Sequence, residues 1–273
     1  SVYKNESDQK VWEIISLALS ELKKFVDHDT AAEHMLRTFA ADLARTQYTR
    51  LGWSAAPGEP EQDTKLRAIV IGCMLYGEDA GAIRQARELY RANTLEQLDA
   101  ELRPLIIGAV VRHDQQPHNI VRALLQTYEN SASAELRSDI ASGVTATRDH
   151  GELKHLIRLL TNTRVIRTQD TVHWFVDLLR NREGRELAWK WLRDNWRWIE
   201  KTFASDKSHD YFPRYAASLL MTRQQLAEYR DFFTPLRNDQ SLVRAIDMGI
   251  LDLEGKLDLI DRDKAAVLAA LAK

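Results

Sequence analysis

Histidine and carboxylate side chains are the residues of this sequence that could hold a catalytic metal ion. A zinc peptidase helix needs two histidines four residues apart and a glutamate after the first, because this spacing places both rings on one side. The eight histidines lack this pattern: His150 and His155 are five residues apart, as are His113 and His118. The sequence therefore predicts no metal site in this chain.

Motifs for nucleophilic catalysis and phosphate binding do not occur in the sequence either. Ser142-Gly143 lacks the first glycine of a Gly-x-Ser-x-Gly turn, and no glycine-rich phosphate loop is present. Cys73, the single cysteine, lies in an apolar run, which predicts a buried and unreactive thiol. We expect no catalytic residue and no cofactor in this chain.

Carboxylates and tryptophans gather in the segment 183–198 and could suggest a paired-acid site or a ligand platform. Glu183, Glu186 and Asp194 alternate with basic residues, which is typical of a solvated, salt-bridged helix face. Four of the seven tryptophans lie at 189, 191, 196 and 198. At helical spacing Trp191 and Trp198 share one face, whereas Trp189 and Trp196 form a second stripe.

Two aromatic stripes favour a helix that is covered on two sides. We expect Trp191 and Trp198 to be largely buried, and Trp189 and Trp196 to contact a different neighbouring helix. Such a helix would lie centrally in a layered helical stack.

Composition narrows the class of protein. The 273 residues are 44% hydrophobic and 29% charged, with a formal net charge of −2, which argues against a nucleic-acid partner. No apolar stretch of about 18 residues occurs, so no membrane segment is expected. One cysteine and the lack of a signal-like apolar region favour a cytoplasmic location. The first residue is Ser1 rather than methionine, which is typical of a processed product or a fragment.

Apolar residues three and four apart predict helices along the whole chain, joined by short connections. Asp29 or Thr30, Asp170 and Thr222 are expected N-caps, and Asp261 or Arg262 is expected to interrupt the last helical stretch. The expected helices span residues 8–26, 30–52, 62–76, 80–92, 95–102, 104–112, 118–128, 132–145, 151–160, 170–179, 184–203, 210–221, 223–233, 241–260 and 263–271.

Short connections imply antiparallel neighbours, so the predicted fold is all-α. We expect an irregular HEAT/armadillo-like α-solenoid of antiparallel helix pairs that forms a concave superhelix, with a single globular bundle as the alternative. No fixed repeat period is present. The chain is expected to be one domain over residues 1–273, with a possible subdivision near 163–170.

Two motifs in the second half carry a family resemblance. They read Arg167-Thr168-Gln169-Asp170 and, from Asn181, NREGRELAWKWLRDNW. They resemble the R-x-Q-D and G-R-x-x-A-W…N-W patterns of the C-terminal helical domain of zinc aminopeptidases of the aminopeptidase N family. That domain is named after the endoplasmic-reticulum aminopeptidases. The motif residues are Gln169, Asp170, Gly184, Ala188, Trp189, Trp191, Asn195 and Trp196.

Shorter matches in the same order extend this resemblance over nearly the whole chain. They are Trp12 to Leu22, Leu51-Gly52-Trp53 with Gly58-Glu59 and Leu66-Arg67, Gln224-Gln225-Leu226, Phe232-Phe233 and Arg244-Ala245-Ile246.

The resemblance implies a non-catalytic role. In such enzymes a separate catalytic domain holds zinc in a His-Glu-x-x-His site, and the C-terminal domain caps the active site and encloses a substrate cavity. Zinc would thus belong to the parent enzyme, and the partners of this chain would be the catalytic domain of the same polypeptide and the peptide substrate. A free-standing α-solenoid that binds proteins is the alternative.

Candidate cavity residues are Arg167 and Arg185 within the motifs, and Arg214 and Tyr215 after Pro213. An arginine can hold a peptide carboxylate. The alternative for the arginines is ion pairing between helices, for instance of Arg185 with Asp170.

Overall fold

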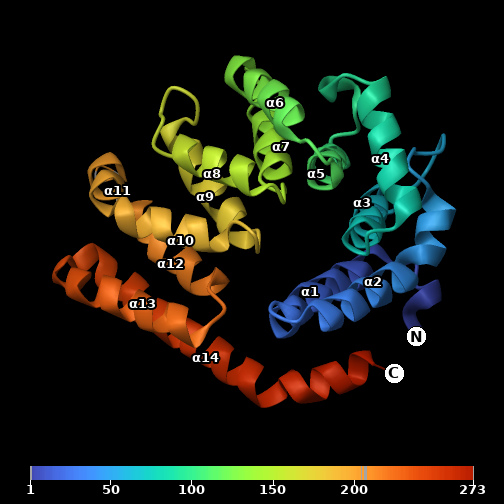
Figure 1. Ribbon diagram of the computed structural model, residues 1–273. Helices are drawn as coiled ribbons and strands as arrows, with labels where there is room; N and C mark the ends of the chain where they lie inside the picture. The colour runs from blue at the N-terminus through green and yellow to red at the C-terminus, as the bar shows by residue number, and fades with distance from the viewer. Residues whose placement is uncertain (1, 204, 206–207, 273) are drawn as a thin grey trace. The chain divides into compact units, whose positions relative to one another are not determined.

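The computed structural model describes residues 2–203, 205 and 208–272, and every regular element in these ranges is helical. The described ranges contain fourteen α-helices and five short 3-10 helices, which confirms the all-α prediction (Figure 1). The chain divides into two compact units. The first unit comprises residues 2–113 and 263–272, and the second comprises the described residues within 114–262. The expected concave superhelix and the expected single domain both concern the arrangement of the two units. These two expectations therefore stay predictions.

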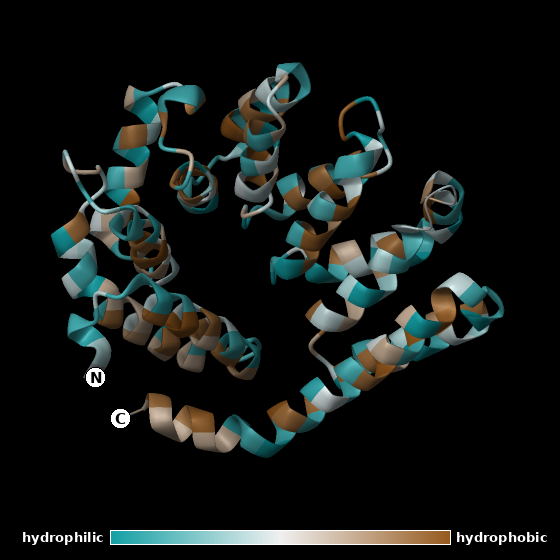
Figure 2. Cartoon of the chain, turned by 180° about the vertical axis from the view of Figure 1, so that it is seen from behind, coloured by the Kyte–Doolittle hydropathy of each residue, from teal (hydrophilic) through white to brown (hydrophobic). Residues whose placement is uncertain are grey.

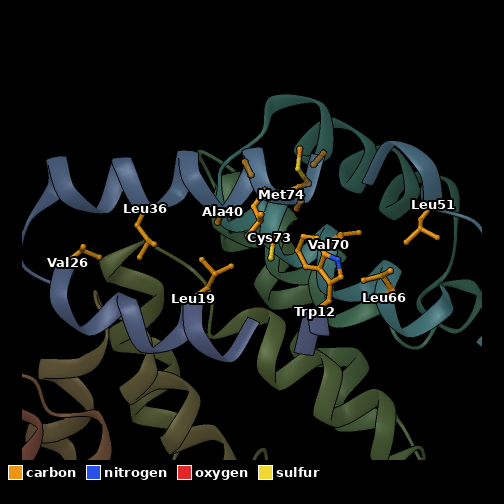
Figure 3. Close-up of a cluster of buried hydrophobic side chains, with 14 of the residues drawn as sticks. Trp12, Leu19, Val26, Leu36, Ala40, Leu51, Leu66, Val70, Cys73 and Met74 are labelled. Atoms are coloured by element: carbon orange, nitrogen blue, oxygen red, sulfur yellow. The ribbon is translucent and has the colours of Figure 1, made fainter. Parts of the chain in front are cut away.

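In the first unit, three long helices pack against one another and a shorter pair follows. The elements are η1 (Val2–Asn5), α1 (Gln9–Val26), α2 (Thr30–Leu51), α3 (Glu61–Tyr76), α4 (Ala80–Ala92), η2 (Leu95–Gln97) and α5 (Arg103–His113). Apolar side chains from α1, α2 and α3 meet in one core, with Trp12, Leu36 and Val70 fully buried (Figure 3). This core cluster follows from apolar residues at three- and four-residue spacing on each helix.

Polar residues define the ends of these helices. The Asp8 carboxylate accepts a hydrogen bond from the Lys10 N–H at 2.8 Å, and Asp29 accepts one from the Ala32 N–H at 2.9 Å. The cap prediction at Asp29 is confirmed. Gly52 ends α2 with φ of 57°, a conformation that glycine adopts without steric cost.

The Leu-Gly-Trp…Gly-Glu…Leu-Arg segment builds the connection between α2 and α3. Arg67 is 2% exposed and donates to the Leu51 carbonyl, at the end of α2, and to the Glu59 carboxylate. Arg50 binds Asp63 through two hydrogen bonds of 2.8 and 2.9 Å. The residues of this segment that resemble the family therefore serve the fold.

The second unit is a series of short helices, most of which pack on near neighbours in the chain. They are α6 (His118–Asn130), α7 (Ala134–Val144), α8 (His150–Leu159), η3 (Thr168–Asp170), α9 (Thr171–Arg180), α10 (Arg185–Asp194), α11 (Trp196–Phe203), η4 (Ser208–Asp210), α12 (Tyr211–Leu219), α13 (Arg223–Phe233), η5 (Thr234–Asn238) and α14 (Gln240–Leu271). The α9 helix contacts α7, α10 and α12, so it lies inside the unit. Thr222 caps α13 together with Gln225, as the sequence predicts.

Four expected helices, in three regions of the chain, differ from those observed. The tryptophan segment is two helices, because α10 ends at Asn195, whose backbone and side-chain N–H groups both donate to the Trp191 carbonyl. The interruption expected at Asp261 or Arg262 was wrong, since α14 is continuous and Asp261 binds Arg223.

Residues 95–102 form only the short η2 turn, where Arg103 donates to the carbonyls of Leu95 and Leu98.

Candidate functional site

The tryptophans of the motif pack against two different neighbours. Trp189 is fully buried, and its ring lies 6.2 Å from the Tyr229 ring and 6.1 Å from the Phe233 ring on α13. The Trp196 ring lies 5.4 Å from the same Phe233 ring. The indole N–H of Trp189 donates to the Glu228 carboxylate at 2.8 Å. The expected second neighbouring helix is therefore α13.

The other stripe faces α9 and α12. Trp191 is 6% exposed, and its ring lies 5.7 Å from Phe175 and 6.3 Å from Phe212. This confirms its predicted burial. Trp198 touches Trp191 edge-on at 6.2 Å but remains partly exposed. The predicted burial thus holds for Trp191 but is only partial for Trp198. Trp189, Trp191 and Trp196 form the interior of the second unit rather than a ligand platform.

Gly184, Arg185 and Ala188 also serve the packing of α10. A Cβ at Gly184 would lie 2.9 Å from the Leu178 carbonyl oxygen, so only glycine fits there without a shift. Arg185 is 6% exposed, and its Nε donates to the Leu179 carbonyl at 3.3 Å. Ala188 is fully buried. Arg185 is thus placed in the interior of the unit.

Asp170 lies at the predicted start of α9 but has a different role. Its side chain makes no cap hydrogen bond and instead accepts one from the Tyr128 hydroxyl at 2.9 Å. Its carboxylate is 3.9 Å from the guanidinium of Arg137. The Tyr128 hydroxyl also accepts from the Trp174 indole at 3.2 Å, and burial raises the pKa of Tyr128 to about 12. This network ties η3 to α6 and α7.

A depression on the second unit is the best candidate for a contact with a ligand. It has a volume of about 500 Å³ and brings together the start of α9, the end of α11 and the start of α12. Among the described residues, its lining consists of uncharged side chains, namely Thr168, Gln169, Val172, Thr202, Phe203, Ser205, Ser208, Tyr211 and Tyr215. Hydroxyl, amide and aromatic groups of this kind can hold a short stretch of peptide by hydrogen bonds and apolar contact.

Two of the residues singled out from the sequence line this depression, and two lie beside it in the chain. Gln169 and Tyr215 are in the lining. Arg167 is exposed and precedes Thr168, whereas Arg214 is half exposed and pairs with Asp210 at 2.7 Å.

Tyr211 is the main residue that the sequence reasoning missed. It is 44% exposed, and its ring is 6.2 Å from that of Tyr215, which is 39% exposed. The spacing of four residues from Tyr215 on one helix could have indicated it.

The described residues contain neither a candidate metal site nor a candidate membrane-spanning helix. No three histidine, cysteine or acidic side chains of this part of the chain gather as a metal site. Within the same ranges, no helix has the length and apolar character to cross a bilayer. Cys73 is 7% exposed, and burial raises the pKa of its thiol to about 11, which confirms the prediction of a buried cysteine.

Comparison with known proteins finds one family over most of the chain. The model of the ERAP1-like C-terminal domain matches residues 1–254. Aminopeptidase N of Lactobacillus helveticus is 32% identical over 256 residues, which are 93% of this chain and 30% of the relative. Aminopeptidase N of Lactobacillus delbrueckii subsp. lactis is 30% identical over 274 residues, 99% of this chain and 32% of the relative.

A plant relative extends the comparison. Aminopeptidase M1-B of Oryza sativa subsp. japonica is 26% identical over 239 residues, 85% of this chain and 27% of the relative. The chain thus spans about a third of the length of these relatives. Since the family model covers nearly all of this helical chain, including the motif residues around α10, the chain belongs to the ERAP1-like C-terminal domain family.

Proposed function

We propose that this chain is the non-catalytic C-terminal domain of a zinc-dependent aminopeptidase that removes N-terminal residues from peptides. The observation that carries this proposal is the family match over residues 1–254, together with identities near 30% to aminopeptidases N over almost the whole chain. The sequence has no His-Glu-x-x-His, so the zinc and the reaction belong to a catalytic domain of the same polypeptide. The single cysteine fits a cytoplasmic enzyme.

In this proposal the domain caps the active site and forms a substrate cavity that governs peptide access and length. The depression around Tyr211 and Tyr215 contacts the part of the peptide that is distant from the cleaved bond. An extended peptide presents backbone polar groups and side chains in alternation, which suits a lining of hydroxyl, amide and aromatic groups. Arg167 and Arg214 are exposed cations that can attract the peptide carboxylate.

The test uses the enzyme that contains this chain and a series of peptides with one N-terminal residue and increasing length. The double variant Tyr211→Ala, Tyr215→Ala is expected to raise KM for long peptides about tenfold, which corresponds to about 1.4 kcal/mol of binding. An aminoacyl amide, which is too short to reach the depression, is expected to be cleaved as before. Phe39→Ala is the matched control, because Phe39 is 42% exposed and lies in the first unit.

Two results would count against the proposal. If the double variant changes the cleavage of the aminoacyl amide as strongly as that of long peptides, the tyrosines act on folding or on the catalytic centre. If it changes neither substrate, the depression is no peptide contact. A gene that encodes no His-Glu-x-x-His site before this segment would instead favour the free-standing scaffold.

A further inference from the structure

The long helix α14 is held firmly along its first half. Six of its residues are buried at helical spacing, and all of them precede residue 258. A Cβ at Gly249 would overlap the hydroxyl of Tyr229, so the helix lies very close to α13 there. That hydroxyl donates to the Pro213 carbonyl at 3.1 Å, which fixes its position. The buried residues are Leu242, Ala245, Ile246, Gly249, Leu253 and Leu257.

Ion pairs attach residues 247–261 of α14 to α13 and η5. Arg223 binds Asp258 and Asp261, each at 2.6 Å. Arg230 pairs with Glu254, and Arg237 pairs with Asp247. The three arginines are seven residues apart, and their partners follow in reverse order along α14. This arginine ladder runs antiparallel along the two segments, and each of its exposed pairs contributes modestly to their association.

Lys256 adds a further attachment of α14 to the second unit. Its ammonium group donates to the carbonyls of Ala217 and Ser218 at the end of α12, at 2.9 and 2.8 Å. A cation at this position also interacts favourably with the C-terminal end of the α12 dipole.

The last part of α14 is held differently. Residues 263–272 belong to the first unit, and none of them is buried. Leu268 and Leu271 are partly buried and pack against the core cluster of that unit, as do Ile15 and Leu22 of α1. Most other residues here are alanines, which offer one methyl group each. Figure 2 shows this apolar end of α14 separated from the preceding apolar turns by a hydrophilic one.

We propose that residues 263–272 are a helical strap that detaches from the first unit and docks on it again, while residues 240–257 stay fixed on the second unit. Segments with few buried apolar contacts open at a low free energy, whereas a fully buried stripe opens only with the unit that contains it. Leu268 and Leu271 pack the strap against the core cluster of the first unit and are only partly buried, whereas six buried residues and the arginine ladder hold the preceding part of α14. Detachment uncovers apolar surface on the core cluster of the first unit. The strap is a property of this fold and is independent of the proposed aminopeptidase role.

Hydrogen–deuterium exchange of the full 273-residue chain, read by mass spectrometry, tests the strap directly. In the unchanged chain, amides of residues 264–271 are expected to exchange at least about a hundredfold faster than those of residues 246–257. The variant Leu268→Ser, Leu271→Ser is expected to speed exchange in α1 to α3 about tenfold and to leave α13 unchanged.

Met248→Ser, Leu251→Ser is the matched control. Both of these residues lie on α14 with the same spacing of three, and they are 49% and 67% exposed. This control is expected to change exchange in neither unit. If the serine variant fails to fold, Leu268→Ala, Leu271→Ala replaces it, and the unchanged chain alone still decides the first comparison.

Equal protection of residues 264–271 and 246–257 in the unchanged chain would overturn the proposal. So would a leucine variant that speeds exchange in α13 as much as in α1 to α3, since the end of α14 would then be an integral part of one cooperative core.

Discussion

At the scale of single residues, the motifs that carry the family resemblance mainly stabilise the fold. Gly184 allows the turn between α9 and α10 to close, Trp189 and Trp191 pack on opposite neighbours, and Asn195 ends α10. Only Gln169 of the motif residues lies in the candidate depression. Motif residues therefore identify the family without marking its functional surface.

Gly184→Ala is expected to lower the free energy of unfolding by about 1–3 kcal/mol, because the new Cβ would crowd the Leu178 carbonyl oxygen. Gly255→Ala is the matched control. A Cβ there meets no atom within 4 Å, and alanine in a helix is about 0.5–1 kcal/mol more favourable than glycine. Urea denaturation of both variants measures the contrast, and equal destabilisation by both would contradict the close approach at Gly184.

Glu228 provides a pH-dependent contribution to stability. Burial opposes its ionisation, but hydrogen bonds from Trp189 and Gln224 and the charge of Arg193 outweigh burial and lower the pKa of Glu228 below its ordinary 4.5. Since the folded state has the lower pKa, the stabilisation is present above about pH 4.5 and is lost as pH falls through the lowered value.

Glu228→Gln is therefore expected to reduce stability by about 1 kcal/mol at pH 7, with a difference that shrinks below about pH 4.5. Denaturation curves between pH 3 and 7 measure this trend, with the exposed Glu129→Gln as the control. If the difference in stability between the unchanged chain and Glu228→Gln stays constant with pH, the ionised form of Glu228 does not stabilise the fold.

The sequence indicates which residues are important here, but it does not indicate which group each side chain binds. Asp170 has the residue type and place of an N-cap, yet its carboxylate accepts from Tyr128, 42 residues away. A local pattern contains no information on such a distant partner. Arg185 and Arg67 likewise donate to carbonyls at the ends of preceding helices, which only the folded chain brings near them.

At the scale of elements, periodicity placed most helices within two or three residues. The observed α4 and α13 have the expected bounds, because the apolar spacing and the caps agree there. The break at Asn195 and the continuity of α14 were not predicted. Both features depend on side-chain contacts rather than on the helix propensity of the residues. The Asn195 side chain donates to the Trp191 carbonyl, and Asp261 binds Arg223.

The arginine ladder is expected to stabilise the packing of α14 on α13 and η5. Replacing Arg223, Arg230 and Arg237 by glutamine is expected to lower the melting temperature by a few degrees at low salt, because α13 and α14 lose their ion pairs. The difference is expected to narrow in 1 M salt, where the screening length is about 3 Å. Thermal unfolding at both salt concentrations measures it.

The control for the ladder is a glutamine triple at Arg91, Arg122 and Arg197, three exposed arginines on other helices. A ladder variant that melts like this control at low salt would show that the buried stripe alone holds α14.

At the scale of the whole molecule, the chain consists of two helical units joined at residue 113 and again within α14. The sequence predicted the helical class, since short connections between amphipathic helices leave few alternatives. It did not predict that residues 263–272 belong with the first unit, because that contact spans nearly the full length of the chain. The sequence did not predict the depression either, because three separate segments of the chain contribute its lining.

In the proposed function, this chain supplies no catalysis and instead modifies the catalysis of a zinc-bearing domain of the same polypeptide. The most direct measurement is release of the N-terminal residue from peptides of several lengths, in the presence of zinc. It compares the chain alone, the catalytic portion of the parent polypeptide alone, and the two together. We expect no turnover by the chain alone and a changed preference for peptide length when the two are mixed. Robust turnover by the chain alone, or a length preference that its addition leaves unchanged, would contradict the proposed function.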